Sequence, residues 1–356
     1  MQATTIPWDD THHSYRRRVR RATLGGLTRS GVSALCRPLT RDSAVIFMLH
    51  RLAEPDEGVT GFDPGILRSI LDALRRAQYE FIDLRSALSR LRGQGRPLRK
   101  AVVFTIDDGY REHATVAAPV FAEFDCPVTT FVTTGFLDRL LWFWWDQIAY
   151  IFSTTHRRTL QVDLPGGRRL YAREPAGWQH AQEDFIAACK ALAEPTKHDA
   201  IRCLAAAAEV DLPEVAPFGC APMTWDELRA AERLGMTFGP HTVTHPILAR
   251  TTDDQSRWEI RASWDRLREE ATAPVPLFAY PNGQPGDFSE REIRTVREIG
   301  LEGACTGFPA YATRRSVQHL DGVFRVPRFA LPDDFAYVEL LVSGLERLRQ
   351  LIRRES

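Results

Sequence analysis

Two adjacent carboxylates, Asp107 and Asp108, directly follow an apolar stretch at residues 101–106. The length and the β-branched residues of that stretch predict a buried strand, and Gly109 allows the chain to turn after it. Acidic residues at the end of a strand lie where α/β folds place their chemistry. Because successive strand side chains point to opposite faces, one carboxylate can bind a metal while the other accepts a proton. The same pair could instead only cap a helix or shape a turn.

Two histidines at positions i and i+4, His241 and His245, come just after a second predicted strand at residues 236–238. If the turn between them is helical, both rings can reach one ion. Neutral imidazole suits Zn²⁺, and either Asp107 or Asp108 would complete a set of three ligands. Three protein ligands leave a coordination position for water, as in catalytic zinc sites. The alternative is a pair of exposed histidines that cap neighbouring elements.

Two more predicted strands end in residues that could do chemistry. Residues 44–49 form a short apolar stretch that ends at His50, and residues 275–280 lead into Pro281-Asn282-Gly283. A histidine at a strand end is a candidate acid or base, although it could also only cap the strand. The second stretch could be no more than a strand followed by a turn.

The order of these elements predicts the fold class. From residue 44 to residue 132, short apolar strands alternate with helices of 3.6-residue periodicity, which predicts a parallel sheet covered by helices. Residues 138–220 interrupt the alternation with an aromatic run at 142–145, a predicted hairpin near residue 166 and two predicted helices. Such aromatic runs more often pack in a core than form a platform for a sugar. The alternation then resumes, so we predict an α/β fold with a helical insertion.

The domain boundaries follow from this pattern. A helix at 225–234 begins at Thr224, with Glu227 at the spacing of a capping box. We further expect a helix at 114–124, a last strand at 324–330 and a closing helix at 335–354. The chain therefore divides into a basic leader at 1–40, the α/β unit at 41–335 including the insertion at 138–220, and a C-terminal helix at 336–356.

Composition excludes several classes of protein and partner. The chain has 356 residues and a formal net charge of zero, from 46 basic and 46 acidic residues, so nothing points to nucleic acid. The cysteines have no CxxC spacing, which argues against a structural zinc ribbon and favours a reducing compartment; they are Cys36, Cys126, Cys189, Cys203, Cys220 and Cys305. The arginine-rich run at 16–21 precedes an interrupted apolar stretch without a cleavage pattern. We expect a cytoplasmic protein with at most peripheral contact with the inner membrane.

Taken together, the four strand-end motifs resemble the polysaccharide deacetylase family, the metal-dependent carbohydrate esterases with NodB homology. Thr105-Ile106-Asp107-Asp108-Gly109 is similar to the family's T-F-D-D-G motif, and His241-Thr242-Val243-Thr244-His245 to H-[ST]-x-x-H. Residues 279–283 lie where the family has R-x-P-Y-G. The resemblance implies a distorted (β/α) barrel, a divalent metal, most simply Zn²⁺, and hydrolysis of N-acetyl groups on a carbohydrate that contains N-acetylhexosamine.

The resemblance also implies roles for individual residues. Asp107 would be the general base, and Asp108, His241 and His245 would bind the metal. A backbone N–H near Asn282 would stabilise the oxyanion. The candidate residues for substrate binding and oxyanion stabilisation are Tyr280, Pro281, Asn282 and Arg328.

The sequence departs from the family pattern in two places. Ala279 stands where the family has the arginine that orients the base, and either Arg328 or Arg325 could replace it. The family's late L-x-H motif, which supplies the general acid, has no evident match near the C-terminus. Residues 46–50 look like that strand moved to the front of a permuted barrel, so His50 is the candidate acid and His319 the alternative.

Two other functions remain open from the sequence. The same metal site could serve an amidase or cyclic-imide hydrolase that acts on a substrate other than a sugar. Alternatively, Ala279 could mark a degenerate module that binds sugar without catalysis, although the complete set of Asp107, Asp108, His241 and His245 argues against degeneration.

Overall fold

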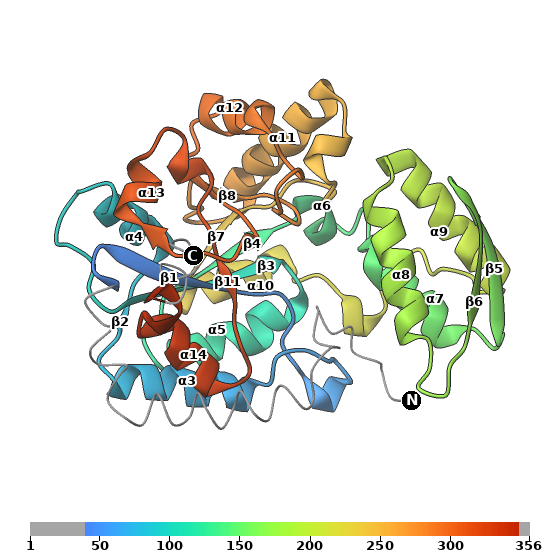
Figure 1. Ribbon diagram of the computed structural model, residues 1–356, viewed down its shortest axis with the longest axis horizontal. Helices are drawn as coiled ribbons and strands as arrows, with labels where there is room; N and C mark the ends of the chain where they lie inside the picture. The colour runs from blue at the N-terminus through green and yellow to red at the C-terminus, as the bar shows by residue number, and fades with distance from the viewer. Residues whose placement is uncertain (1–39, 349–356) are drawn as a thin grey trace.

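The computed structural model describes residues 40–348, which Figure 1 draws in colour. Most of the predicted leader and the last part of the predicted C-terminal helix lie outside these residues. Among the described residues, no helix is both long enough and apolar enough to cross a membrane.

Four neighbouring parallel strands form the centre of the fold. They are β1 (Ser43–Leu49), β3 (Ala101–Asp108), β4 (Val128–Val132) and β7 (Met236–Pro240). The register places Phe47 beside Phe104, and Asp107 beside Phe131. All four strands match stretches predicted from the sequence, because each is a short, fully or almost fully buried apolar run.

Short strands at the C-terminal side close the sheet into a distorted barrel. β8 (Leu277–Ala279) pairs in parallel with β9 (Gly303–Cys305), and Cys305 forms a bridge with Val326. The chain then reaches β11 (Phe329–Ala330), which pairs in parallel with β1. Two shorter strands lie at the N-terminal ends: β2 (Glu80–Phe81) beside β3, and β10 (Ala312–Thr313), antiparallel to β1. The (β/α) barrel predicted from the sequence is therefore confirmed.

Helices cover the barrel on its outside (Figure 1). They are α3 (Pro64–Arg76), α4 (Leu84–Leu91), α5 (Ala118–Ala122), α10 (Trp225–Arg233), α11 (Asp253–Glu270), α12 (Glu290–Glu298), α13 (Arg314–Gln318) and α14 (Phe335–Val342); a short helix, α6 (Thr134–Leu137), follows β4. The predicted capping box at Thr224 and Glu227 is present at the start of α10 and satisfies N–H groups that the helix itself leaves unpaired.

The alternation of side chains along β3 divides the core in two. Val102 and Phe104 belong to one apolar cluster, together with residues of α3 and α5. Val103 belongs to a second cluster, together with residues of α4 and α12. Because side chains alternate along a strand, Asp107 points to the same side as Val103, and Asp108 points to the other side.

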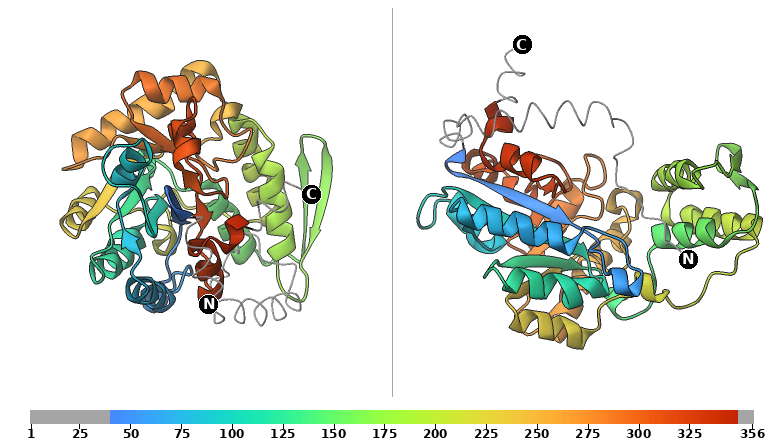
Figure 2. Two further views of the ribbon diagram at one scale, coloured as in Figure 1. Left: turned by 60° about the vertical axis from the view of Figure 1, so that its left-hand side comes forward. Right: turned by 90° about the horizontal axis from the view of Figure 1, so that it is seen from below.

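The insertion forms a separate lobe beside the barrel (Figure 2). It consists of α7 (Trp144–Thr154), the hairpin of β5 (Thr159–Leu164) and β6 (Gly167–Ala172), α8 (Gln179–Lys190) and α9 (Glu194–Ala208). The predicted hairpin is confirmed. Gly166, which follows Pro165 in its two-residue turn, adopts the positive φ that such a turn favours at its second position. The lobe has its own apolar cluster, which includes Ile148, Phe185 and Leu204.

Three predicted elements differ from the structure. The predicted strand at 324–330 is reduced to β11, because a 3₁₀ turn (Gly322–Phe324) precedes it and Pro327 has no N–H for a ladder. The predicted helix at 335–354 is interrupted after Val342, where Gly344 adopts a φ of 85°. The predicted helix at 114–124 begins as a π-helical turn (His113–Ala117) before α5, since Pro119 cannot donate the usual helical hydrogen bond.

Candidate active site

The candidate site lies where parallel strands end at one edge of the barrel. β1 ends before His50, β3 ends at Asp108, and β7 ends before His241. Because the three strands run parallel within one sheet, with β4 between β3 and β7, their C-terminal ends lie at the same edge. The structure thus brings together residues that are separated by up to 191 positions in the sequence, from His50 to His241.

The backbone after β3 turns through two consecutive residues with positive φ. Asp108 has a φ of 90° and Gly109 a φ of 98°. A β-carbon at position 109 would lie 2.7 Å from Leu137 Cδ1, so this turn needs glycine. Positive φ is unfavourable for aspartate, and such backbone strain is common at functional sites. The turn directs the Asp108 side chain towards the two histidines.

Asp108, His241 and His245 form a buried cluster that can hold a metal ion. Asp108 Oδ1 lies 3.8 Å from His241 Nε2 and 3.6 Å from His245 Nε2. One ligand atom from each residue lies within 4.8 Å of the others. Two imidazoles and one carboxylate on one side of an ion are a familiar set for Zn²⁺ and other divalent transition metals.

The loop that carries the two histidines is not helical, which corrects the geometry expected from the sequence. His241 directly follows β7, and Thr242 and His245 have φ values of 68° and 59°. The rings nevertheless converge, with centroids 4.8 Å apart. Within the loop, the His245 N–H donates to Thr242 Oγ1 at 3.0 Å.

Glu259, a buried residue of α11, holds this loop from behind. Its Oε2 accepts the N–H groups of Val243 and Thr244 at 2.8 and 2.9 Å, and its Oε1 accepts the Thr244 hydroxyl. One carboxylate therefore satisfies three donors between the two histidines. The sequence analysis missed Glu259. A usable signal was a glutamate next to Ile260 and at helical spacing from Leu267, the apolar residues that α11 buries.

The hydrogen bond made by Nδ1 of His241 fixes the protonation state of Nε2, the other ring nitrogen. His241 Nδ1 lies 2.7 Å from the carbonyl oxygen of Ala279, so Nδ1 carries the proton and donates it. The Nε2 lone pair then faces Asp108, as required of a metal ligand. Burial lowers the pKa of both His241 and His245, which keeps the rings neutral.

The charge of Asp108 provides an independent test of whether a cation fits. Its Oδ1 is buried and has no hydrogen-bond partner among the described residues. Burial and the nearby charge of Asp107 raise the pKa of Asp108 well above its usual range. A cation between Asp108 Oδ1 and the two Nε2 atoms would satisfy the orphaned oxygen and stabilise the ionised carboxylate. The residues present therefore fit a divalent metal.

Asp107 has a different partner, Arg328. The guanidinium donates from Nη1 to Asp107 Oδ1 and from Nη2 to Oδ2, both at 2.7 Å. Arg328 also donates to Thr105 Oγ1 and to the carbonyl of Thr306, and it is 1% exposed. This pairing holds the pKa of Asp107 well below its usual range despite burial. Of the two arginines proposed from the sequence, Arg328 reaches the site, whereas Arg325 pairs with Glu290 at the surface.

His50 lies on the other side of Asp107. Its Nε2 is 4.0 Å from Asp107 Oδ2, and its side chain is 28% exposed. Burial of the ring lowers the pKa of His50 to about 4, and the charge of Arg328 acts in the same direction. The backbone carbonyl of His50 accepts a hydrogen bond from His113 Nε2, which fixes the backbone at the end of β1.

The segment after β8 requires one correction. Tyr280 was expected to contact substrate, but its ring is 1% exposed and stacks on Phe288 with centroids 3.9 Å apart, within the second apolar cluster. Its side chain is therefore a core residue. Pro281 is buried, and Asn282 has a φ of 61°. Among the described residues, the Asn282 N–H donates to no acceptor, whereas those of Tyr280 and Gly283 donate to Cys305 and Pro281.

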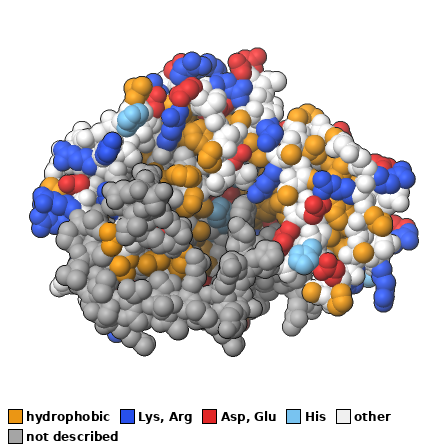
Figure 3. All heavy atoms as spheres, in the orientation of Figure 1, with side chains coloured by type: hydrophobic (Ala, Val, Ile, Leu, Met, Phe, Trp, Pro, Cys, Tyr) orange, Lys and Arg blue, Asp and Glu red, His pale blue; other side chains and the backbone are white. Residues whose placement is uncertain are grey.

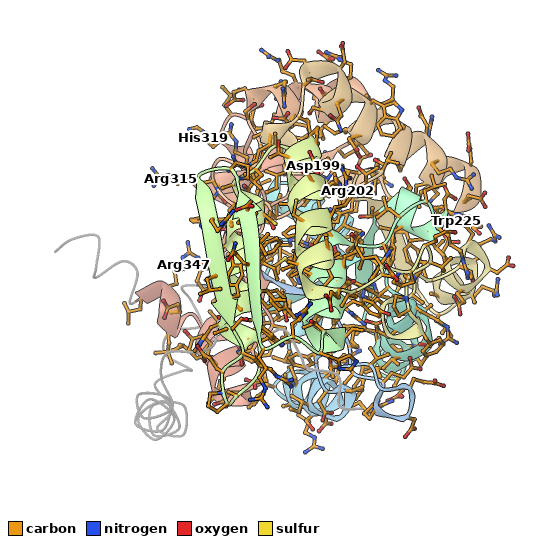
Figure 4. All side chains as sticks on the ribbon, turned by 90° about the vertical axis from the view of Figure 1, so that its right-hand side faces the viewer. Asp199, Arg202, Trp225, Arg315, His319 and Arg347 are labelled. Carbon is orange, nitrogen blue, oxygen red and sulfur yellow. The ribbon has the colours of Figure 1, made fainter. Side chains whose placement is uncertain are left out.

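His319, the alternative acid, lies at the opposite end of the barrel. It ends α13, which directly follows β10, and β10 pairs with the first residues of β1. His50 follows the last residue of the same strand, so the seven residues of β1 separate the two ends by roughly 20 Å. Figure 4 shows His319 with Arg315 at the edge of the molecule. The structure therefore excludes His319 from the site.

The insertion contributes to the wall of the site through its first helix. The Trp145 and His245 ring centroids are 4.8 Å apart, and Trp145 Nε1 donates to the Tyr110 hydroxyl at 3.0 Å. That hydroxyl donates in turn to Asp146 Oδ2 at 2.7 Å. The four aromatic residues at 142–145 therefore have two different environments. Trp145 is partly exposed beside a histidine of the site, and the other three residues are buried in apolar clusters.

Comparisons with known proteins found one matching family profile and solved structures of similar fold. The polysaccharide deacetylase family profile matches residues 198–304. The deacetylase PplD of Streptococcus pyogenes, solved in complex with acetate, is similar in structure, with a TM-score of 0.54 and 16% identity over 86% of this chain and 99% of that one. IcaB from Ammonifex degensii has a TM-score of 0.52 and 16% identity over 85% of this chain and 97% of its own. No curated protein matches the sequence significantly.

Proposed function

Because the polysaccharide deacetylase profile matches residues 198–304 and the fold is similar to those of PplD and IcaB, we propose that the chain belongs to that family and uses a divalent cation to remove N-acetyl groups from a carbohydrate that contains N-acetylhexosamine. The observation that carries the proposal is the buried Asp108 Oδ1, which has no partner among the described residues and faces two imidazole nitrogens. The paired carboxylate of Asp107 lies directly beside it. One acid is thus available for a metal and the other for a proton.

Asp108, His241 and His245 would hold the cation. Their donor set, one carboxylate oxygen and two neutral imidazole nitrogens, favours Zn²⁺ among common metals. A cation held there would lower the pKa of a water molecule and polarise the acetyl carbonyl.

Asp107 would act as the general base that takes a proton from the attacking water. A base must be ionised before the reaction, and the two hydrogen bonds from Arg328 keep Asp107 in that state. The same bonds fix its orientation, since a bidentate guanidinium allows one arrangement of the carboxylate. Arg328 therefore supplies the charge that Ala279 cannot, which removes the main argument for a degenerate, non-catalytic module.

The Asn282 N–H and His50 would serve the later part of the reaction. The Asn282 N–H has no acceptor among the described residues and could donate to the oxyanion that forms at the carbonyl carbon.

Burial keeps His50 neutral in the free protein, so the proton for the leaving amine must reach it during turnover. Asp107, which holds the proton taken from water, faces the His50 ring across 4.0 Å. Transfer over that gap would make His50 the immediate acid for the amine.

An acetate-release assay on N-acetylglucosamine oligomers tests the proposal. We expect release by the purified full chain, loss after chelation, and recovery when Zn²⁺ is restored. Asp107→Asn should still bind the metal yet lose about a hundredfold or more in turnover. Activity on cyclic imides together with none on any N-acetylated sugar would assign the site to the amidase reaction instead. A chain that binds no metal and releases no acetate would overturn the proposal.

A further inference from the structure

We propose that the end of the barrel opposite the active site is a docking surface for a membrane that contains anionic lipid. We call this surface the basic rim and define it by Arg41, Arg92, Arg96, Arg99, Arg314 and Arg315, all of which are exposed. The site chemistry makes no use of these residues, so the inference is separate from the proposed reaction.

Hydrogen bonds to backbone carbonyls join three distant segments into this rim. The Asp42 N–H donates to the carbonyl of Leu98, and the Arg314 N–H donates to the carbonyl of Asp42. Gln318 Nε2 donates to the carbonyl of Arg92, which connects α13 to the end of α4. The segments around residues 41, 92–99 and 314 are therefore fixed beside one another at the N-terminal ends of β1 and β3.

The acidic residues near the rim already have cationic partners. Glu80 pairs with Arg90, Glu302 pairs with Arg85, and Asp321 pairs with Arg297. Within the rim itself, Arg41 Nε lies 4.0 Å from Asp42 Oδ2. Within residues 40–348, no carboxylate lies within ion-pair distance of the other five rim arginines, which are Arg92, Arg96, Arg99, Arg314 and Arg315. Figure 3 shows Lys and Arg side chains gathered at the corresponding edge, with few acidic ones among them. Because the whole chain has no net charge, this concentration of positive charge is a local feature.

An exposed apolar side chain at the same rim favours a lipid surface over a nucleic acid. Leu320 follows α13 directly and is 81% exposed, the highest value among the large apolar residues of the described chain. A leucine that points into water gains free energy by entering the headgroup region, and nearby arginines are attracted to anionic lipid. A polyanion without an apolar phase would use the arginines and leave Leu320 in water.

Docking through this rim would leave the active site accessible. β1 begins at the rim and ends at His50, so the two ends of the barrel lie roughly 20 Å apart. With the rim on the membrane, the site would open away from the lipid surface. The arginine-rich run at 16–21 lies outside the described residues, and the inference does not depend on it.

Co-sedimentation with vesicles tests the inference on the full chain. We expect the protein to bind vesicles of equal parts phosphatidylcholine and phosphatidylglycerol, not to bind phosphatidylcholine alone, and to dissociate as salt is raised. Each arginine near an anionic surface contributes about fivefold to partitioning. The double variant Arg314→Glu/Arg315→Glu should therefore bind at least about 25-fold more weakly. Glutamate is tolerated in the first turn of a helix such as α13, so the fold should persist.

The insertion provides matched controls. Arg158→Glu/Arg173→Glu changes the charge by the same amount at two exposed arginines that flank the hairpin, and Leu170→Ser removes a leucine that is 70% exposed on β6. We expect both controls to bind like the wild type, and Leu320→Ser to weaken binding to anionic vesicles. All variants should release acetate from soluble oligomers at the wild-type rate, which separates this test from that of the reaction.

Three outcomes would overturn the inference. The first is vesicle binding by the Arg314→Glu/Arg315→Glu variant equal to that of its charge-matched control. The second is no salt-sensitive binding of the wild type to anionic vesicles. The third is equally strong binding to a DNA duplex that falls in the arginine variant and does not change in Leu320→Ser, which would assign the rim to a nucleic acid.

Discussion

Replacing Arg328 by methionine should change the pH at which the enzyme works, because it would leave a buried carboxylate without its counter-charge. Arg328 is 1% exposed and makes two 2.7 Å hydrogen bonds to Asp107. Removing one partner of a buried ion pair typically costs about 3–5 kcal/mol. If the ionised form of Asp107 loses that stabilisation and the protonated form does not, the pKa of Asp107 rises by about two to four units, at 1.36 kcal/mol for each unit.

The direction of the effect follows from the two states of Asp107. In the wild type its pKa lies well below the usual range, so the pair stabilises the folded protein at neutral pH and loses that effect only as pH falls through the lowered pKa. In Arg328→Met, burial acts on Asp107 without the opposing charge of the guanidinium, so the pKa of Asp107 rises. The free-energy difference between wild type and variant should therefore be largest near neutral pH and should shrink as pH falls.

Activity measurements against pH give the sharper readout. Because the pKa of Asp107 starts well below its usual range, a rise of about two to four units should move the acidic limb of the kcat/KM profile of Arg328→Met upward by as much. The variant should therefore lose activity at an acidic pH where the wild type still works, and recover it as pH rises and Asp107 ionises without help. Asp107→Asn, which cannot ionise, should remain inactive at every pH. Arg328→Lys should fall between the wild type and the methionine variant, since lysine retains the charge and loses the bidentate geometry. If Arg328→Met has the wild-type profile, or stays inactive at high pH while folded and metal-loaded, Arg328 does not set the charge of the base.

Three further outcomes are expected from single substitutions. His245→Ala should abolish stoichiometric binding of Zn²⁺, measured by metal analysis after dialysis, because two ligands do not make a stable site; full occupancy would remove the proposed ligand set. His50→Ala should retain metal and lose turnover on acetamides far more than on acetate esters of acidic phenols, which leave without a proton; equal losses would exclude it as the acid. Glu259→Ala should weaken Zn²⁺ affinity by about 10- to 100-fold, and Glu259→Gln by much less, because an amide oxygen can still accept the two loop N–H groups; wild-type affinity in Glu259→Ala would show that the loop needs no such support.

The parts of the site that the sequence predicted are those encoded by local patterns. A buried apolar strand followed by a polar residue places that residue at a barrel edge, and this pattern is enough to locate His50, Asp107, Asp108 and His241 there. The same pattern gives positions and no roles, so the assignment of base, acid and ligands stays a prediction that the substitutions above test. It also misplaced the Tyr280 side chain, since a strand-end residue can point into the core as readily as towards the edge.

The parts that the sequence left open depend on contacts between distant segments. Arg325 and Arg328 are three residues apart in a short irregular stretch, so no periodicity distinguishes the one that faces Asp107. The distinction comes from the pairing of β11 with β1, which puts Phe329 beside Phe47. The convergence of His241 and His245 was predicted through a helical turn, whereas the structure achieves it with two residues of positive φ. Tertiary contacts, Glu259 among them, hold a loop that local propensity would not form.

The dependence of the base on barrel closure has a consequence for how the active state forms. Arg328 lies 221 residues after Asp107 in the chain, and it reaches the base only when the last strand, β11, pairs with the first, β1. Until that happens, Asp107 is either exposed to water or buried without a partner, and burial alone would protonate it. The three metal ligands need no such closure, because they lie on β3 and on the loop after β7, on the other side of β4 from β3. Metal binding and a working base are therefore separable in this fold, and a variant that weakens the β1–β11 pairing should bind metal yet deacetylate poorly.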